Sequence, residues 1–328
     1  MVINSIPLSQ KIVSDIRYWK RFFSIQIRFV RTFSNYFHII SKLLKIQFPI
    51  LIKIKNAGKI QIKTYNAAYF ISHISDFKNV QFDINKDLVL ISNKRKDGVN
   101  STIKFHGGVN NGDLIHSFLK SDYSNLPIFD KWVLDIGMNI GDSSIYFILN
   151  GAKKVIGVEP FPRNFEMALK NVTENNLQEK IELVMKGCSS QEGKITIDTN
   201  SGGNVDDVTE ESKTGLEIPL TTLEGIIKKY NIPKNSILKM DCEGCEDEII
   251  SSVTNEVINH FSNIQIEYHN GYQEIKNKLE KCGFNVHVSK PISSNVLGNL
   301  VGRFSNKLTL SKKIGYVGFV YAEKRGNN

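Results

Sequence analysis

Apolar residues between Arg17 and Leu44 recur every three or four positions, with only Gln26 breaking the row, a spacing typical of an amphipathic helix. They are Trp19, Phe23, Val30, Phe33, Phe37, Ile40 and Leu44. The longest uncharged stretch within this segment, residues 32–41, has ten residues, whereas a helix that crosses a bilayer needs ~20. We therefore predict a long amphipathic helix that does not span a membrane.

The next segment alternates apolar and polar positions in short runs, a pattern typical of antiparallel strands. The runs cover residues 50–54, 59–64, 80–84 and 88–92, and turn residues at 56–58 and 85–87 separate them. This pattern predicts a small β subdomain at about residues 50–105. Glycines and asparagines at 107–112 then mark a break before a predicted helix at 113–121.

From residue 131 onward, short and strongly apolar runs alternate with helical segments. The runs cover residues 132–136, 155–158, 181–184, 237–240 and 264–266. This repetition predicts an α/β domain with a mostly parallel, seven-stranded sheet and helices on both faces. A polar, Gly-rich piece at 189–220 interrupts the repeat, with extra strands expected at 194–197 and 217–220. We expect this piece to lie over a ligand site.

Length and composition fit an ordinary globular protein and exclude disorder as the main state. The chain has 328 residues, 41% hydrophobic and 23% charged. Residues 1–60 hold eleven Lys and Arg against one acid, a balance of +10, while the remainder has 31 basic and 32 acidic residues. We predict a basic helical segment at 1–48, the β subdomain at 49–109 and the main domain at 110–328. The nearly neutral main domain argues against nucleic-acid binding.

The basic N-terminal segment has two readings. Lys and Arg beside aromatic residues favour contact between residues 15–45 and an anionic membrane surface. The alternative is that the helix packs on the main domain or on the second subunit of a homodimer.

Four cysteines are too few for a disulfide framework, and no signal-peptide pattern opens the sequence. These features predict a cytoplasmic protein.

The first candidate site follows the strand at 132–136. Asp135 lies near the end of this strand, Gly137 and Gly141 form a Gly-x-x-x-Gly turn, and Glu159 ends the second strand. Ligands of such sheets bind at the carboxyl ends of the strands. The turn lacks the Gly-x-Gly-x-x-Gly spacing of dinucleotide sites, and a carboxylate would repel a diphosphate. Asp135 therefore favours a cationic ligand such as S-adenosylmethionine, with Glu159 placed to bind the ribose hydroxyls.

A second cluster, at residues 237–246, comprises the fourth strand and the turn after it, and residues 264–269 include the fifth strand and its end. With Asp135 to Asp142 and Glu159-Pro160, the run Lys239 to Glu246 resembles the motifs of the FkbM-type methyltransferase family, over about residues 110–290. The resemblance implies a Rossmann-like class I fold, S-adenosylmethionine as cofactor and a hydroxyl of a sugar, glycolipid or small natural product as acceptor. The expected cofactor-binding residues are Asp135, Gly137, Asn139, Gly141, Asp142, Glu159, Pro160, Phe161 and Asp241.

Asp241, Glu243, Glu267 and His269 are expected to cluster at the strand ends that face the transferred methyl group. A positioned base helps an alcohol lose its proton as the new bond forms. We expect Glu243 or His269 to be this base and Asp241 to hold the methionine amino group, without a metal ion.

Two rival functions are open. One is a non-catalytic protein on a degraded methyltransferase fold, docked to a membrane or partner through its basic helix. The other is a metal-dependent hydrolase with Asp241, Glu243 and His269 as ligands.

Cys242 and Cys245 form a Cys-x-x-Cys motif typical of half a zinc site or of a redox pair. We interpret them instead as two small residues in a strand-to-helix turn.

Overall fold

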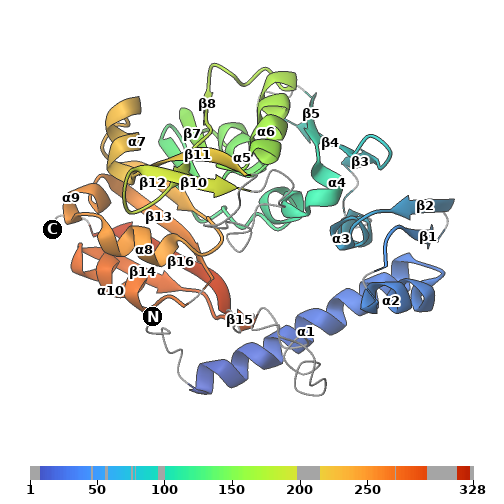
Figure 1. The fold of residues 1–328 in the computed structure, drawn as a ribbon. Coiled ribbons are helices and arrows are strands. Elements are labelled where there is room, and N and C mark those ends of the chain that lie inside the picture. The colour runs from blue at the N-terminus through green and yellow to red at the C-terminus, as the bar shows by residue number, and fades with distance from the viewer. Residues whose placement is uncertain are drawn as a thin grey trace.

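The computed structural model describes residues 8–45, 47–55, 58–74, 77, 79–94, 100–197, 215–269, 271–293 and 316–325. Its centre is one large sheet (Figure 1), with strands in the order β14-β16-β13-β12-β6-β7-β8. In chain order the strands are β6 (Trp132–Ile136), β7 (Lys154–Val158), β8 (Ile181–Val184), β12 (Ser236–Met240), β13 (Phe261–Tyr268), β14 (Phe284–Val288) and β16 (Tyr316–Lys324). A two-residue strand, β15 (Ile292–Ser293), also pairs with β16.

The sheet is mostly parallel. Strands β8, β7, β6, β12 and β13 pair in parallel with their neighbours, while β16 runs antiparallel to both β13 and β14. The predicted α/β class and mostly parallel, seven-stranded sheet are therefore confirmed. The last two strands had not been located in the sequence. Because the sheet order turns back between β6 and β12, the carboxyl ends of these strands flank the position where Rossmann-like sheets bind ligands.

Two hydrophobic clusters cover the two faces of the sheet. Successive residues of a strand point to opposite faces, so Val133 joins one cluster and Leu134 the other. Helices α5 (Asp142–Leu149) and α6 (Pro162–Glu174) contribute to the first cluster through Phe147 and Val172. The helices that contribute to the second are α7 (Leu223–Tyr230), α8 (Glu246–Ser252), α9 (Asn255–Ile258) and α10 (Gln273–Lys281).

The N-terminal segment forms two helices, where the apolar spacing predicted one. Helix α1 (Leu8–Thr32) runs along one edge of the molecule and α2 (Tyr36–Leu44) follows it (Figure 1). The backbone between them leaves the helical path because Ser34 donates its N–H to Lys53 and the Asn35 side chain bonds the backbone of Leu51 and Lys53. Contacts with the strand at 50–54 outweigh the helical pattern. Within the described residues, none of the helices combines the length and apolar character that a bilayer crossing requires.

The segment after α2 contains two small sheets with a helix between them. Strands β1 (Ile50–Ile54) and β2 (Gly58–Ile62) form a hairpin, and β3 (Val80–Asp83), β4 (Leu88–Lys94) and β5 (Asn100–His106) form a three-stranded sheet. The pattern missed β5 and helix α3 (Tyr65–Ile74), whose run Ala67 to His73 is buried and so has no polar face to reveal its period. Both small sheets share the first hydrophobic cluster.

The helix predicted at 113–121 is shorter and of another type. Helix α4 (Gly108–Asn111) precedes it, and η1 (Ile115–Leu119) is a single π-helical turn. The extra strands expected after β8 are confirmed as β10 (Gly193–Ile197) and β11 (Leu216–Thr221), an antiparallel pair extended by β9 (Gly187–Cys188). Residues 198–214, inside the piece expected to cover a site, lie outside the described residues.

Candidate active site

A cavity of about 340 Å³ opens at the carboxyl ends of β6, β7, β12 and β13. Ile195 of β10 and Leu220 of β11 also line it, so the expected covering role of the inserted piece holds for these two strands. Most of the residues expected at the site meet here. Those that line the cavity are Gly137, Asn139, Asp142, Glu159, Pro160, Phe161, Asp241 and Glu243, whereas Asp135, Gly141 and His269 do not.

The turn after β6 depends on its first glycine. Gly137 has φ +73°, and a Cβ there would lie 1.7 Å from the carbonyl oxygen of Asp241. No side chain fits, so the backbone of this turn approaches β12 directly. Asn139 is also left-handed, with φ +51°, and its Nδ2 donates to Asp113 (2.5 Å). Gly141 caps α5 and lies against Ala168 instead of the cavity.

Glu159 is held at the cavity wall by backbone N–H groups. Its two carboxylate oxygens accept N–H groups from Asn139 and Phe161, each at 3.0 Å. Only 4% of the residue is exposed, and burial raises its pKa to about 7 although both hydrogen bonds lower it. The carboxylate is thus fixed at the cavity wall and is only partly ionised at neutral pH.

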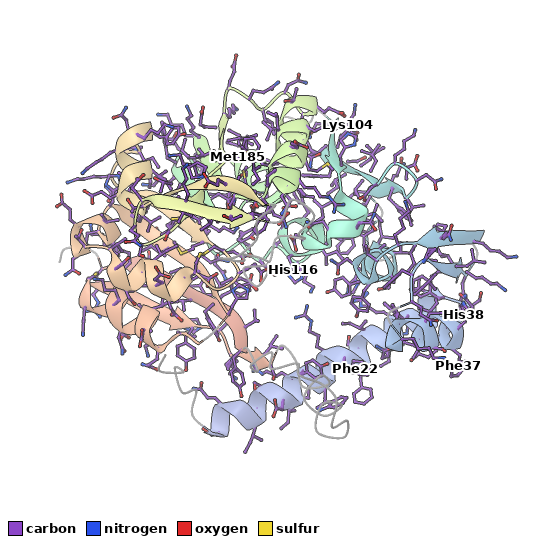
Figure 2. The ribbon with its side chains drawn as sticks, in the orientation of Figure 1. Phe22, Phe37, His38, Lys104, His116 and Met185 are labelled. Carbon is purple, nitrogen blue, oxygen red and sulfur yellow. A yellow bond between two sulfur atoms is a disulfide. The ribbon has the colours of Figure 1, made fainter. Side chains whose placement is uncertain are left out.

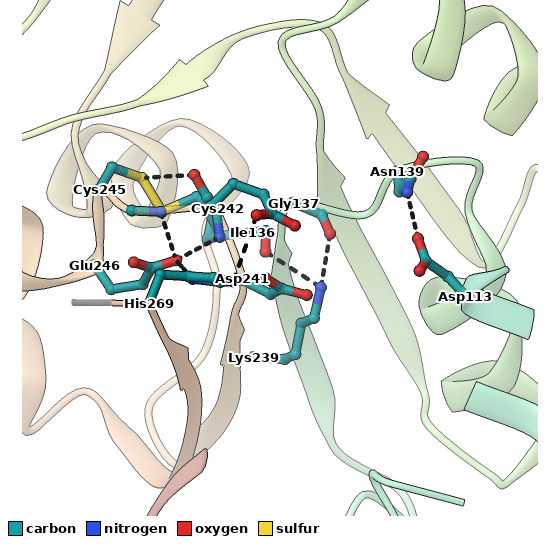
Figure 3. Close-up of polar contacts among 12 residues, drawn as sticks. Asp113, Ile136, Gly137, Asn139, Lys239, Asp241, Cys242, Cys245, Glu246 and His269 are labelled. Atoms are coloured by element: carbon teal, nitrogen blue, oxygen red, sulfur yellow. Dashed lines mark hydrogen bonds and ion pairs between the residues drawn. A yellow bond between two sulfur atoms is a disulfide. The ribbon is translucent and has the colours of Figure 1, made fainter. Parts of the chain in front are cut away.

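Asp135 lies beneath the turn, and its role differs from the predicted one. Its carboxylate is fully buried, lies 3.0 Å from Lys239 Nζ and accepts the hydroxyls of Ser143 and Ser144 at 2.6 and 2.7 Å. Lys239 also donates to the Gly137 carbonyl at 2.6 Å (Figure 3). Burial opposes the charge of Lys239, but Asp135 and Asp241 raise its pKa above the usual value. Asp135 therefore fastens the turn to β12 and does not face the ligand space.

Carboxyl groups at other positions crowd the cavity. Asp113, Asp142, Glu159, Asp241, Glu243 and Glu267 line it, and Lys239 is the sole lysine or arginine among its described lining residues. Burial raises the pKa of Asp142 to about 6. Burial first, and then neighbouring carboxylates, raise the pKa of Asp113 and Glu267 well above the ordinary range. A cationic ligand would favour the ionised forms of these crowded carboxyl groups.

Three of the expected catalytic side chains meet at the ends of β12 and β13. His269 Nε2 lies 3.9 Å from Asp241 Oδ1 and 3.5 Å from Glu243 Oε2. Its Nδ1 lies 3.2 Å from Glu246. Burial lowers the pKa of His269, but Glu246, Asp241 and Glu243 together raise it to about 10. Figure 3 shows Asp241 and His269 on one side of the site and the pair Asn139 and Asp113 on the other.

Comparison with known proteins assigns the central part of the chain to a family. Residues 135–286 match the methyltransferase FkbM domain. We call residues 135–286 the FkbM domain after the family model that they match. It contains the turn after β6, Glu159 and the whole cluster around His269, so the resemblance inferred from the motifs is confirmed.

Individual relatives of the FkbM domain are distant. Protein 158B of Sulfolobus islandicus rod-shaped virus 1 is 30% identical over 127 residues, 39% of this chain and 56% of the viral protein. Methyltransferase sdnD of Sordaria araneosa is 25% identical over 179 residues, 44% of this chain and 69% of that protein. A solved methyltransferase FkbM from Methylobacillus flagellatus covers 62% of this chain and 46% of its own, with 15% identity and a TM-score of 0.39. The chain thus spans little more than half of the viral relative.

Two cysteines of the FkbM domain are bonded, contrary to our interpretation of them as small turn residues. Cys242 and Cys245 form a disulfide across the turn between β12 and α8. Both line the cavity, and Glu246 accepts the backbone N–H of Cys242 and of Gly244. The disulfide therefore closes the same turn that presents Glu243.

The cavity also contains residues that precede the FkbM domain and that the sequence motifs did not predict. Asp113 lines the cavity and binds Asn139, and His116 Nδ1 lies 2.9 Å from Asp122 at the same wall. Ser117 of η1 donates its hydroxyl to Asp142. No motif marks these residues, because they come from an irregular segment whose path depends on packing against α5.

Proposed function

We propose that this chain is an S-adenosylmethionine-dependent methyltransferase. The observation that carries the proposal is the acidic cavity with Glu159 fixed at its wall. S-adenosylmethionine brings a sulfonium and an ammonium group, which the surrounding carboxylates favour. Its ribose hydroxyls can donate to a carboxylate that backbone N–H groups already hold in place. Membership of the FkbM domain family supports the same activity.

The proposed cofactor position follows from the two ends of the cavity. Glu159 binds the ribose, with Pro160 and Phe161 beside the adenine. Asp241, at the end of β12, accepts the methionine ammonium. The sulfonium methyl then points toward the end of the cavity that Glu243 and Glu267 line.

We further propose that the acceptor is a hydroxyl of a sugar, glycolipid or small natural product. Methyl transfer is an in-line displacement, so positioning accounts for much of the rate. Glu243 lines the cavity, whereas His269 lies behind it against Glu246. Of the two expected bases, Glu243 is therefore the one placed to take the acceptor proton. It also has φ +60°, a strained conformation of a kind that clusters at active sites.

Calorimetry with S-adenosylmethionine separates this proposal from its rivals. A non-catalytic docking protein on a degraded fold and a hydrolase would both fail to bind the cofactor specifically.

We also propose that the protein works in the cytoplasm, in contact with a membrane surface.

The affinity for S-adenosylmethionine should rise with pH. Burial raises the pKa of Glu159 to about 7. The ligand-free fold therefore loses stability as the pH rises from 4.5 toward 7, because Glu159 ionises more readily in the unfolded chain. The ligand needs the ionised form, so affinity should fall about tenfold per pH unit below 7. Calorimetric titrations between about pH 6 and 8 test this dependence.

Glu159→Gln should weaken binding by ~1–3 kcal/mol and flatten that pH dependence. Glu182→Gln, at an exposed position of β8, is the control and should titrate like the unmodified chain. An unchanged titration curve for folded Glu159→Gln would remove the cofactor assignment.

The membrane part of the proposal rests on the exposed face of α1. Its apolar residues Ile12, Ile16, Phe23, Ile27 and Val30 are each between 46% and 58% exposed. Steps of three, four and seven place them on one helix face. Lys20, Arg21 and Arg31 are exposed as well, and Asp15 is the single acid of α1. Phe37 of α2, 87% exposed, extends this edge of the molecule (Figure 2).

This charge pattern favours anionic lipid over a second copy of the chain. A symmetric dimer through α1 would bring two basic faces together, whereas each Lys or Arg near an anionic bilayer contributes ~1 kcal/mol. Phe23→Ser with Ile27→Ser should abolish salt-sensitive binding to phosphatidylserine vesicles. Leu169→Ser, which removes an exposed leucine on α6, should not.

The double replacement is preferable to deleting residues 1–45, because Phe29, Phe33 and Ile39 belong to the first hydrophobic cluster. Equal vesicle binding by both variants would contradict the membrane proposal. A fall from dimer to monomer in the double variant, measured by light scattering, would favour the homodimer.

A further inference from the structure

The three side chains at the ends of β12 and β13 are spaced as ligands around one ion. One ligand atom from each of Asp241, Glu243 and His269 lies within 4.8 Å of the other two. His269 Nε2 lies 3.5 and 3.9 Å from the two carboxylate oxygens, which is too far for good hydrogen bonds. Two ligands about 2.1 Å from a metal ion and separated by a tetrahedral angle lie about 3.4 Å apart. The two distances from His269 Nε2 are therefore compatible with a shared cation.

The histidine is held with Nε2 directed at the carboxylates. Glu246 is 2% exposed, and its Oε1 accepts N–H groups from Cys242 (2.9 Å) and Gly244 (3.2 Å). That oxygen is an acceptor, so His269 Nδ1 donates to it at 3.2 Å. Metal-binding histidines are oriented in this way, with the remote ring nitrogen bonded to a carboxylate. Glu246 thus fixes the ring with Nε2 toward the two carboxylates, and a cation bound there would take the place of the proton on Nε2.

A buried oxygen at the centre of the cluster supplies an independent observation. Asp241 Oδ1, the atom that faces His269 Nε2, is buried and has no hydrogen-bond donor within the described part of the chain. A buried carboxylate oxygen without a partner carries a desolvation cost. A cation between Asp241, Glu243 and His269 would remove that cost.

We propose that Asp241, Glu243 and His269 bind one divalent cation, which holds the acceptor hydroxyl beside the methyl group. One imidazole and two carboxylates suit ions such as Mn²⁺ or Zn²⁺. Asp241 and Glu243 each use one oxygen for the ion, through Oδ1 and Oε2. Their second oxygens stay available for the methionine ammonium and for the acceptor proton.

The chemical purpose of the site rests on the proposed methyltransferase function. The acceptor hydroxyl binds the cation, and the positive charge of the ion lowers the pKa of the hydroxyl. Its oxygen then forms the new bond to the methyl carbon while the bond from that carbon to sulfur breaks, and the electron pair of that bond neutralises the sulfonium. The hydroxyl proton moves to Glu243 Oε1. The products are the methyl ether, S-adenosylhomocysteine and the protonated carboxyl group.

The direct test is Mn²⁺ binding by the full chain after treatment with a chelator. Mn²⁺ prefers oxygen and nitrogen ligands, so it reports on this cluster without capture by Cys242 and Cys245 should their disulfide be reduced. Electron paramagnetic resonance of free Mn²⁺ should show one bound ion per chain. Glu243→Gln, at a half-exposed side chain, should weaken binding at least about tenfold. Glu274→Gln, at an exposed position on α10, is the control and should bind like the unmodified chain.

The outcomes separate this inference from the proposed function. Binding of S-adenosylhomocysteine with no Mn²⁺ binding, or with equal Mn²⁺ binding by the unmodified chain and Glu243→Gln, overturns the metal site and leaves the methyltransferase proposal standing. Site-dependent Mn²⁺ binding without any cofactor binding supports the metal site and removes the methyltransferase function. Turnover that a chelator abolishes and Mn²⁺ restores supports both.

Discussion

Glu243→Gln is expected to lower turnover by about 10²–10⁴-fold, the usual contribution of a positioned general base. The amide preserves the shape of the side chain but cannot take the acceptor proton as a carboxylate does. The cofactor is held by Glu159 and Asp241, so S-adenosylmethionine should still bind with nearly unchanged affinity. Turnover has to be measured with the true acceptor, saturating cofactor and a pH series.

The control for this prediction is Glu274→Gln, which should keep full activity. A full rate in Glu243→Gln would contradict the role of Glu243 in activating the acceptor. The cause of a loss can also be identified. If a higher Mn²⁺ concentration restores the rate, the variant lost a metal ligand, and if it does not, the variant lost its proton acceptor.

Five strands of the large sheet were predictable because each contains a short apolar run in the parallel part of the sheet. Strands β6 and β8 have the bounds that the runs indicated. Elements that depend on distant contacts were not predictable. The break between α1 and α2 comes from hydrogen bonds of Ser34 and Asn35 to a strand that follows later, and α3 has no polar face to reveal its period.

The candidate site was predictable where residues follow strand ends within one motif. Glu159, Asp241 and Glu243 line the cavity as expected. Asp113 was missed because it enters from outside the sheet and has no sequence signal. Asp135 was assigned to the ligand because a sequence does not show which strand-end acid turns inward. That choice depends on the parallel register of β6 and β12, which sets Asp135 directly beside Lys239.

Asp135→Ala should destabilise the fold by about 3–5 kcal/mol, since removing one partner of a buried ion pair leaves an uncompensated charge. Lys239 is 3% exposed and lies 3.0 Å from Asp135, so its ammonium group would lose its closest counter-charge. Ser143 and Ser144 would lose their shared acceptor as well. Urea unfolding followed by tryptophan fluorescence measures the change as a lower midpoint.

The double variant Asp135→Leu with Lys239→Met distinguishes a stabilising pair from a ligand contact. Replacing both ions of a buried pair by apolar residues of similar volume is often neutral, so the double variant should recover most of the stability lost by Asp135→Ala. Asp135→Asn should keep the serine hydrogen bonds but lose the charge, and should therefore remain strongly destabilised. If Asp135→Ala instead unfolds at the normal midpoint and loses only affinity for S-adenosylmethionine, Asp135 contacts the ligand and the pair with Lys239 does not hold the turn.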